Sequence, residues 1–340
     1  MTAALLVPAL AAALLGSGAP ATPSALPTPA GDLVSETEIP SIYVEGQPFV
    51  VKLTVTATGE KPSRLPSWLT TPAGWLIDAR PLVRRDESID LTLLPGQSLV
   101  TSLDIGPMIA DRIGEDGRDF RIKYSESVGD PKDVFYLSLP EQGIDFETLP
   151  KEQLAGYHVV LQTTGGPVWL ELWPEVAPKH VRNFLDLTSK GYYDGSDFHR
   201  VIPNFMIQGG KAKDGSPPPR KLDAEFSSRR HAAGVLSAAR LGNDINSATS
   251  EFFIVHRASP HLDGSYTAFG QVVVGMDSVD EVVRAVESHY KLINALKKNG
   301  VRIDDRRPQV ATAMNKPNPP QAIQQALVVR ASRSRPKRNK

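Results

Sequence analysis

An arginine and a glutamine stand among apolar residues in one short stretch of the chain. The stretch runs from residue 198 to residue 210 and reads FHRVIPNFMIQGG. Arg200 carries a charged guanidinium with a fixed fork of donors, and Gln208 carries an amide that donates and accepts. Donors of this kind stabilise a changing charge distribution best in a water-poor setting.

Composition excludes several other chemistries. The chain has no cysteine, which rules out thiolate metal sites, disulfide bridges and thiol nucleophiles together. Its seven histidines are scattered without an HExxH pattern, and no GxSxG motif occurs. Lysine plus arginine equals aspartate plus glutamate at 38 each, so no global field marks a binder of nucleic acid or anionic membrane. We therefore expect no metal, no cofactor and no specific nucleic-acid partner.

The stretch 198–210 resembles the cyclophilin family of peptidyl-prolyl cis/trans isomerases and matches the signature FHRVIPxFMxQGG at every defined position. Segments far from it agree, and together they resemble the bacterial-type subset of the family over residues 156–315. The agreeing segments are 168–178, 183–184, 191–195, 234–240, 246–254 and 262–270. The resemblance implies a closed antiparallel β-barrel capped by two α-helices in this part of the chain.

The reaction that the resemblance implies is rotation about the peptide bond before proline. That bond interconverts over a barrier of about 18–20 kcal/mol, and rotation must abolish the amide resonance without breaking a bond. Arg200 would point its donors at the prolyl nitrogen and carbonyl, while Gln208 would hold or supplement them. Because no proton has to be removed, we interpret the neighbouring His199 as structural.

An apolar pocket for the pyrrolidine ring is the second implied part of the site. By residue type alone Phe205, Met206, Phe253 and Leu262 would be core residues, and the resemblance makes them pocket walls. The substrate-binding residues that we expect are Phe205, Met206, Ala239, Arg240, Glu251, Phe253, His261, Leu262 and Tyr266.

Three of these positions differ from common family members. His261 stands where relatives often have tryptophan or phenylalanine, which contribute to cyclosporin affinity, so we expect a weak response to cyclosporin. Tyr266 stands where many relatives have histidine and bacterial-type members have tyrosine. Glu251 replaces a common glutamine. Because a carboxylate only accepts hydrogen bonds, it could divert Arg200 or Arg240 from substrate, or it could prefer a positively charged peptide flank.

The N-terminus is typical of an exported protein. Residues 3–15 form an apolar run of signal-peptide length, and Ala19-Pro20-Ala21 has the form of a cleavage site. The run is short for a membrane-spanning helix, which needs about 20 apolar residues. We expect residues 1–21 to be a cleaved signal peptide, with an uncleaved anchor or a misread start as alternatives. Residues 22–32 should be a flexible leader rich in proline and alanine.

Residues 33–145 predict a β domain. Apolar residues recur with period two over 49–55, 89–93 and 120–124, and turn signals such as Glu45-Gly46 and Pro95-Gly96 separate the runs. With no helical period of useful length between them, the pattern favours an antiparallel sandwich of Ig-like kind. It holds no catalytic constellation, so we interpret the domain as a spacer or adhesion module, or else as a surface that docks a partner.

After a linker at 146–155 the pattern mixes strands with helices. One helix should begin at Pro178 and end at Gly191, with residues 181, 184, 185 and 188 on its buried face. A second should begin with the capping box Ser278-x-x-Glu281. We expect a helical surface insertion at 289–298 and a last strand near Val310. The tail, 316–340, should be disordered, and it is either solvated or attracted to an anionic surface.

The predicted fold is therefore mainly β: an Ig-like β-sandwich at 33–145, then a cyclophilin-like closed β-barrel with two helices at 156–315. The predicted function is a peptidyl-prolyl isomerase that acts on X-Pro bonds of exported proteins and assists their folding. The alternative is a non-catalytic module that binds proline peptides and is tethered through the sandwich. Expected partners are proline-containing peptides or unfolded exported proteins, with an unknown partner at 33–145. The location is periplasmic or extracellular, or membrane-anchored if the N-terminal segment is not cleaved.

Overall fold

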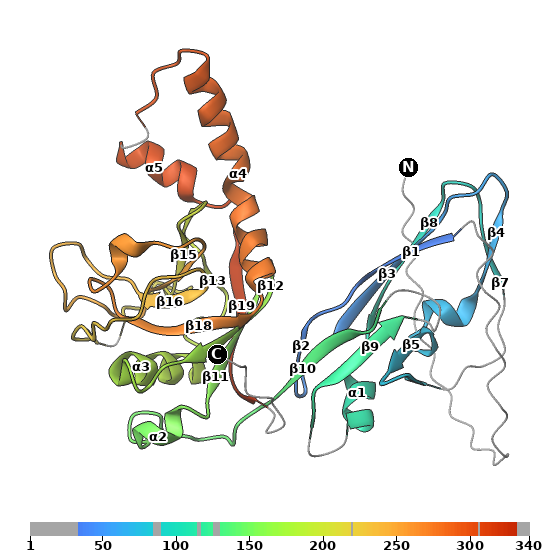
Figure 1. The fold of residues 1–340 in the computed structure, drawn as a ribbon, viewed down its shortest axis with the longest axis horizontal. Coiled ribbons are helices and arrows are strands. Elements are labelled where there is room, and N and C mark those ends of the chain that lie inside the picture. The colour runs from blue at the N-terminus through green and yellow to red at the C-terminus, as the bar shows by residue number, and fades with distance from the viewer. Residues whose placement is uncertain are drawn as a thin grey trace.

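The computed structural model describes residues 33–83, 90–113, 117–124, 130–218, 220–304 and 307–331. Figure 1 shows two bodies, an N-terminal one in blue to green and a C-terminal one in green to red. The expected signal peptide (1–21), the leader (22–32) and the end of the basic tail (332–340) lie outside the described residues. The mainly β class expected from the sequence is confirmed.

Two layers of strands build the N-terminal body. One layer is an antiparallel sheet of β1 (Leu33–Glu38), β3 (Val50–Ala57) and β8 (Ser98–Asp104), in that order. The other layer is, in order, β2 (Ile42–Val44), β10 (Lys132–Ser138), β9 (Phe120–Tyr124), β5 (Trp75–Ile77) and β6 (Arg80–Pro81). A separate two-stranded antiparallel sheet pairs β4 (Ser63–Pro66) with β7 (Asp90–Leu93). Two short 3-10 helices, η1 (Ser67–Thr70) and η2 (Pro72–Gly74), follow β4.

The alternation read from the sequence builds the core between these layers. In β3 the residues Val51, Leu53 and Val55 are buried, while those between them are not. They belong to one apolar cluster with Trp75 in β5 and Ile122 in β9. Apolar side chains at every second position therefore hold the two layers together. The Ig-like assignment stays a prediction.

Two features of this body differ from the expected antiparallel sandwich. Strand β2 runs parallel to β10. A helix, α1 (Gly106–Ile113), also intervenes, and it buries Ile109 and Ile113 in the core. The helix begins where Asp104 Oδ1 accepts a hydrogen bond from the Gly106 N–H at 3.0 Å. Eight residues are too few for a clear helical period, which explains why the sequence did not predict this helix.

The segment 146–155, expected as a linker, packs against the C-terminal body. Phe146 and Leu154 are buried in its core, and the short helix α2 (Lys151–Leu154) lies in the segment. The Phe146 ring meets the Tyr157 ring edge-on, with centroids 5.2 Å apart. Apolar side chains thus make the segment part of the body instead of a free connection.

One long sheet forms the C-terminal body and continues into the N-terminal one. Its strands, in pairing order, are β14 (Arg200–Ile202), β15 (Met206–Gly209), β17 (Phe252–Val255), β16 (Val235–Ala238), β18 (Ala268–Val274), β12 (Gly166–Leu172), β11 (His158–Thr163) and β19 (Ala322–Ala331), which then pairs with β10. The short β13 (Ser196–Asp197) also pairs with β19. Over the described residues this path does not return on itself, so the closed barrel is not confirmed.

Two helices pack on this sheet. The first, α3 (Pro178–Ser189), begins at Pro178 and contacts β18 and β19. Its expected buried face is confirmed at Val181, Phe184, Leu185 and Thr188, and Gly191 follows it at φ 68°. The second, α4 (Met276–Lys298), contacts β12, β14 and β15.

Helix α4 starts earlier and runs further than expected. Its N-cap is Gly275 at φ 105°, so Ser278 and Glu281 lie inside the helix and the predicted capping box is wrong. Ser278 Oγ instead donates to the carbonyl of Pro167 at 3.0 Å. The segment 289–298, expected as a separate insertion, continues the same helix, which rises above the body in Figure 1.

The C-terminal part of the chain corrects two further predictions. The strand expected near Val310 is a helix, α5 (Pro308–Asn315), and the tail expected to be disordered from 316 contains β19. Ile323 and Val328 of β19 are buried in the core of the C-terminal body, and Val329 is buried in a second apolar cluster. Prolines before the strand and basic residues after it obscured this apolar run, and the body extends to residue 331.

Candidate active site

The hairpin of β14 and β15 places the two polar residues of the candidate site side by side. Arg200 and Gln208 face each other in the antiparallel register, so their side chains leave the sheet on one face. Arg200 Nη1 donates a hydrogen bond to Gln208 Oε1 at 3.3 Å. Val201 is turned the other way and is buried in the core. Val201 therefore anchors β14 in the core, while the guanidinium of Arg200 lies at the surface.

A small cavity opens beside this pair. Its volume is about 90 Å³, which is about three times the share of one water molecule in the liquid. The walls come from the β14–β15 hairpin, β17, the segment after β16 and the 3-10 turn η3 (Pro260–Leu262). The lining residues are Arg200, Phe205, Met206, Gln208, Ala239, Arg240, Phe253, Leu262 and Tyr266. Of the residues expected from the sequence, only Glu251 and His261 are outside this set, and each contacts a member of it.

Larger hollows lie elsewhere on the described surface, at about 710 to 860 Å³. None of those described is lined by Arg200 or Gln208. Size alone therefore does not identify the site, and the small cavity is distinguished by the charged pair at its edge.

The floor of the cavity is apolar and rigid. Met206, Phe253 and Leu262 are at most 5% exposed, and they form one cluster with Trp173 and Val255 beneath. These side chains are thus core residues on one side and cavity wall on the other. These residues are therefore both core residues, as their types indicate, and cavity walls, as the resemblance implies.

Arg240 is fixed along the opposite wall. Its guanidinium carbon lies 4.6 Å from the centre of the Tyr266 ring, and its Nε donates to the Ser265 carbonyl at 3.1 Å. Its Nη1 donates to the carbonyls of Leu241 and Gly242 at 2.8 and 3.3 Å. Backbone oxygens and an aromatic face therefore occupy Arg240, which makes it a wall of the site more than a free cation.

Glu251 lies behind Gln208 and not against either arginine. Gln208 Nε2 donates to Glu251 Oε2 at 3.0 Å, and His199 Nε2 lies 3.2 Å from the same oxygen. Lys211 Nζ is 3.9 Å from the other carboxylate oxygen. Among the described residues, neither arginine of the cavity pairs with this carboxylate. The sequence-based possibility that Glu251 diverts Arg200 or Arg240 is therefore wrong.

The same contacts control the charge of Glu251. Burial alone would raise the pKa of its carboxyl group. Hydrogen bonds from His199 and Gln208 and the charge of Lys211 outweigh this effect and hold the pKa below its usual range. The carboxylate is therefore ionised at neutral pH, and it orients the Gln208 amide with its oxygen towards Arg200.

Two histidines at the cavity have different surroundings. The His261 ring lies against Phe205, with centroids 5.3 Å apart, so it extends the wall at the solvent side. The sequence did not single out His231, whose ring stacks on Phe253 at 6.2 Å and whose Nδ1 lies 3.0 Å from Asp263 Oδ1. Burial lowers the pKa of His231, although Asp263 acts in the opposite direction. No motif marks this residue, and only the folded geometry places it behind the pocket wall.

Neither a metal cluster nor a membrane span is found where the chain is described. Within those residues no group of three or more histidine, aspartate or glutamate side chains could hold a metal ion. Within the same residues, every helix is too short or too polar to span a lipid bilayer.

Comparison with known proteins adds to this geometry. Residues 158–305 match the family model described as cyclophilin type peptidyl-prolyl cis-trans isomerase/CLD. A probable peptidyl-prolyl cis-trans isomerase of Brucella suis biovar 1 (strain 1330) is 42% identical over 145 residues, which are 38% of this chain and 73% of the relative. Peptidyl-prolyl cis-trans isomerase B of Bacillus subtilis (strain 168) is 44% identical over 117 residues, covering 33% of this chain and 80% of the relative.

A solved structure was also matched. It is a cyclophilin type peptidyl-prolyl cis-trans isomerase of Cryptosporidium parvum, crystallised in the presence of the dipeptide Ala-Pro. It is 25% identical, with a TM-score of 0.39, and the match covers 50% of this chain and 98% of the other.

The two curated relatives, from Brucella suis and Bacillus subtilis, are both named peptidyl-prolyl cis-trans isomerases, and these enzymes are isomerases that change a conformation. The chain belongs to the cyclophilin-type peptidyl-prolyl cis-trans isomerase family.

Proposed function

We propose that this isomerase acts on X-Pro bonds of exported proteins and assists their folding, with Arg200 and Gln208 as its catalytic pair. The observation that supports the proposal most is the exposed guanidinium of Arg200 beside a small cavity with an apolar floor. A prolyl ring can enter the cavity while its amide stays within reach of the guanidinium. The same arrangement offers no nucleophile, and none is needed.

Arg200 acts on the amide nitrogen and carbonyl. Amide resonance is lost as the C–N bond rotates, and the nitrogen regains a lone pair that can accept a hydrogen bond. The guanidinium has five N–H donors, and one hydrogen bond to Gln208 Oε1 leaves others for the substrate. Gln208 in turn is held by Glu251. The pair therefore presents a cation that is already oriented before substrate binds.

Arg200 alone cannot supply all of the transition-state stabilisation that the reaction needs. A ten-thousandfold acceleration requires about 5.5 kcal/mol of transition-state stabilisation. One hydrogen bond to a charged group supplies about 1.5–3 kcal/mol. Selective binding of the twisted peptide by the cavity walls supplies the remainder.

The walls divide into a ring pocket and a rim. Phe205, Met206, Phe253 and Leu262 contact the pyrrolidine ring, and Ala239, Arg240 and Tyr266 line the path of the neighbouring peptide. His261 stands at the rim, where it contacts a substrate flank, and Glu251 acts on the flank from behind Gln208. His261 leaves this rim less apolar than tryptophan would, and a weak cyclosporin response stays a prediction.

The proposal of exported substrates is supported by the N-terminal sequence. The apolar run 3–15 and the Ala19-Pro20-Ala21 motif are typical of a secretory signal. We expect the mature protein, isolated from the periplasm or the medium, to begin at residue 22 by N-terminal sequencing. A cytoplasmic protein with residues 1–21 intact would contradict export, and a membrane-bound one would select the uncleaved anchor. In any of these places the N-terminal body, 33–145, would dock a partner or act as a spacer.

Relaxation of an X-Pro peptide tests the catalytic assignment. We expect Arg200→Ala to lower kcat/KM by about a hundredfold, because the loss of one preorganised donor from an active site costs about 2.7–4 kcal/mol, more than an ordinary hydrogen bond. Arg284→Ala, which removes an exposed arginine of α4 outside the cavity, is the matched control and should be neutral. Equal rates for wild type and Arg200→Ala would defeat the assignment. Peptide binding without acceleration by the wild type would select the alternative of a non-catalytic proline-binding module.

A further inference from the structure

The turn between β14 and β15 has a backbone donor that the turn itself cannot satisfy. The Phe205 N–H donates to the Ile202 carbonyl at 3.1 Å and closes a four-residue turn. Pro203 is its second residue, and Asn204 is its third at φ 61°, which is the pattern of a type II turn. Proline has no N–H, and the Asn204 N–H takes no part in the closing bond. Without another partner this donor would be unpaired.

His256 supplies the missing partner. Its Nδ1 accepts a hydrogen bond from the Asn204 N–H at 2.9 Å, and its own backbone N–H donates to the Phe205 carbonyl at 2.8 Å. The residue is 5% exposed. One buried histidine therefore holds both the third and the fourth residue of the turn.

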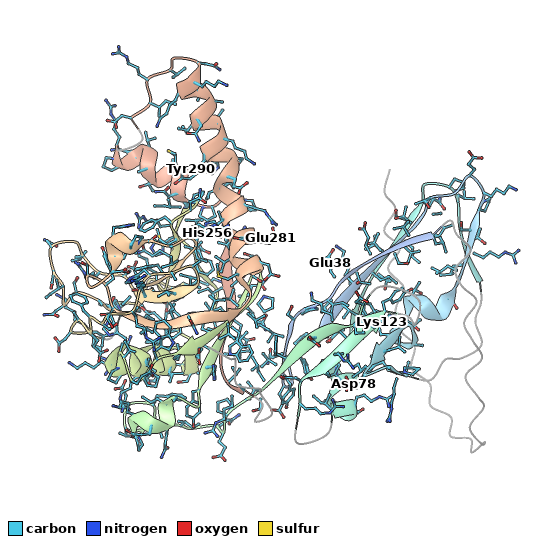
Figure 2. All side chains as sticks on the ribbon, in the orientation of Figure 1. Glu38, Asp78, Lys123, His256, Glu281 and Tyr290 are labelled. Carbon is cyan, nitrogen blue, oxygen red and sulfur yellow. The ribbon has the colours of Figure 1, made fainter. Side chains whose placement is uncertain are left out.

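Helix α4 orients the imidazole from the other side. His256 Nε2 lies 2.8 Å from Asp280 Oδ1, and Figure 2 labels His256 near the base of α4. A backbone N–H can donate only to an unprotonated nitrogen, so Nδ1 is bare and Nε2 carries the hydrogen that Asp280 accepts. Arg257 is a charged group beside this pair, since its Nη1 lies 3.9 Å from the same carboxylate oxygen and donates to the His256 carbonyl at 3.1 Å.

The turn joins two parts of the proposed site. Arg200 lies on the strand that enters it, and Phe205 is its last residue. The guanidinium carbon of Arg200 is 6.0 Å from the centre of the Phe205 ring. His256 does not line the cavity. The direct hydrogen bonds of His256 to Asn204 and Phe205 make the turn its shortest connection to the site.

We propose that His256, oriented by Asp280, is a positioning residue for the isomerisation: it holds the β14–β15 turn through the Asn204 N–H and so sets the placement of Phe205 relative to Arg200. This inference rests on the proposed function of Arg200 and the cavity. A shift of about 1 Å at a reacting geometry can lower a rate by about a hundredfold, so a small movement of the turn is enough to matter.

The tautomer can be measured directly in the wild-type protein. Nitrogen-15 NMR of the full chain, labelled at histidine and recorded at neutral pH, should show His256 with a bare Nδ1 and a protonated Nε2. A protonated Nδ1 would overturn the proposal, since the Asn204 N–H would then have no acceptor. This measurement does not depend on activity, so it distinguishes failure of the positioning role from failure of the proposed function.

Two substitutions test the link to catalysis. His256→Asn keeps an acceptor near the position of Nδ1, and His256→Leu removes it. We expect His256→Leu to lower kcat/KM for an X-Pro peptide by about tenfold. His256→Asn should stay within about threefold of wild type, because only the asparagine variant keeps an acceptor for the Asn204 N–H. Asp280→Ala should fall between them.

The matched control is His180, a buried histidine of α3 that also binds a carboxylate, with its Nδ1 2.7 Å from Glu225 Oε2. His180→Leu should destabilise the body without the loss of kcat/KM. The proposal is overturned if His180→Leu lowers kcat/KM as much as His256→Leu does, or if the asparagine and leucine variants of His256 are equally active. If His256→Leu does not fold, the NMR measurement and the asparagine variant still decide the question.

Discussion

The N-terminal and C-terminal bodies both bury aromatic side chains between strands, yet the candidate site lies in only one of them. In the N-terminal body Trp75 and Phe49 are closed in between two layers. In the C-terminal body Phe253 is also buried, but one side of it faces an open cavity with Arg200 at the edge. An apolar core therefore becomes a binding site where a hairpin leaves part of it uncovered and places a charged side chain at the edge of the resulting cavity.

The two bodies are nevertheless joined by apolar contact. A cluster of six buried residues takes half its members from each side: Ile42, Val44, Leu137, Val160, Trp169 and Val329. Strands β10 and β19 also pair at Leu137 and Ala331. The junction between the two bodies is therefore a small apolar core. Changes in one body, followed by measurements of stability and activity in the other, test whether the two bodies depend on each other.

Removal of β19 should have the largest effect. A chain that ends at residue 321 loses the strand between β11 and β10, so we expect the C-terminal core to unfold and isomerase activity to disappear. The N-terminal cluster contains no residue of β19 and should stay protected in hydrogen exchange. A chain that ends at residue 331 is the control and should keep activity. An active chain ending at 321 would show that β19 is dispensable.

A core substitution in the N-terminal body should have a large but local effect. Trp75 is fully buried, and its replacement by alanine should cost about 3–5 kcal/mol of that body's stability. Separate probes for each body are required because a single unfolding transition is not assured in a two-body chain. We expect kcat/KM to stay within about twofold of wild type below the transition. A parallel loss of activity would mean that the site depends on the N-terminal core.

The smallest effect on turnover is expected for Glu251→Gln. Glutamine can still accept from Gln208, so kcat/KM should be equal or higher by about twofold, with the same peptide assay as readout. A large loss would show that the acid itself is needed.

The same variant should change the stability in acid. The pKa of Glu251 is lowered in the folded chain relative to an unfolded value of about 4.3. Its contribution to stability is therefore present above that pH and is lost as the pH falls through the folded pKa. Denaturant titrations between about pH 6 and pH 3 should thus show a smaller loss of stability for the variant than for the wild type. Identical curves would contradict the hydrogen-bonded carboxylate.

Residue patterns correctly predicted the elements whose buried side chains follow from the spacing of apolar residues in their own sequence. The alternation in β3 and the buried face of α3 follow directly from the period of their apolar residues. In both elements neighbours in the sequence determine the outcome. The family resemblance, taken over several distant segments, located the nine residues that line one cavity.

The remaining features depend on contacts between distant segments. β19 was obscured by prolines and basic residues, and its burial depends on partners more than 150 positions earlier, as in the pairing of Val329 with His158. His231 and His256 carry no motif, and their importance follows from a stack on Phe253 and a bond to the Asn204 N–H. The sequence left open whether Glu251 pairs with Arg200 or Arg240, and the fold instead places its carboxylate against Gln208, which faces Arg200 across the hairpin.

The most direct test of the central claim is exchange spectroscopy of an X-Pro peptide, in which cis and trans signals are followed with wild-type chain and with Arg200→Ala at equal occupancy of the site. The account predicts rapid exchange with the wild type and exchange slower by about a hundredfold with the variant, while both still bind the peptide. Equal exchange rates at equal occupancy would contradict it.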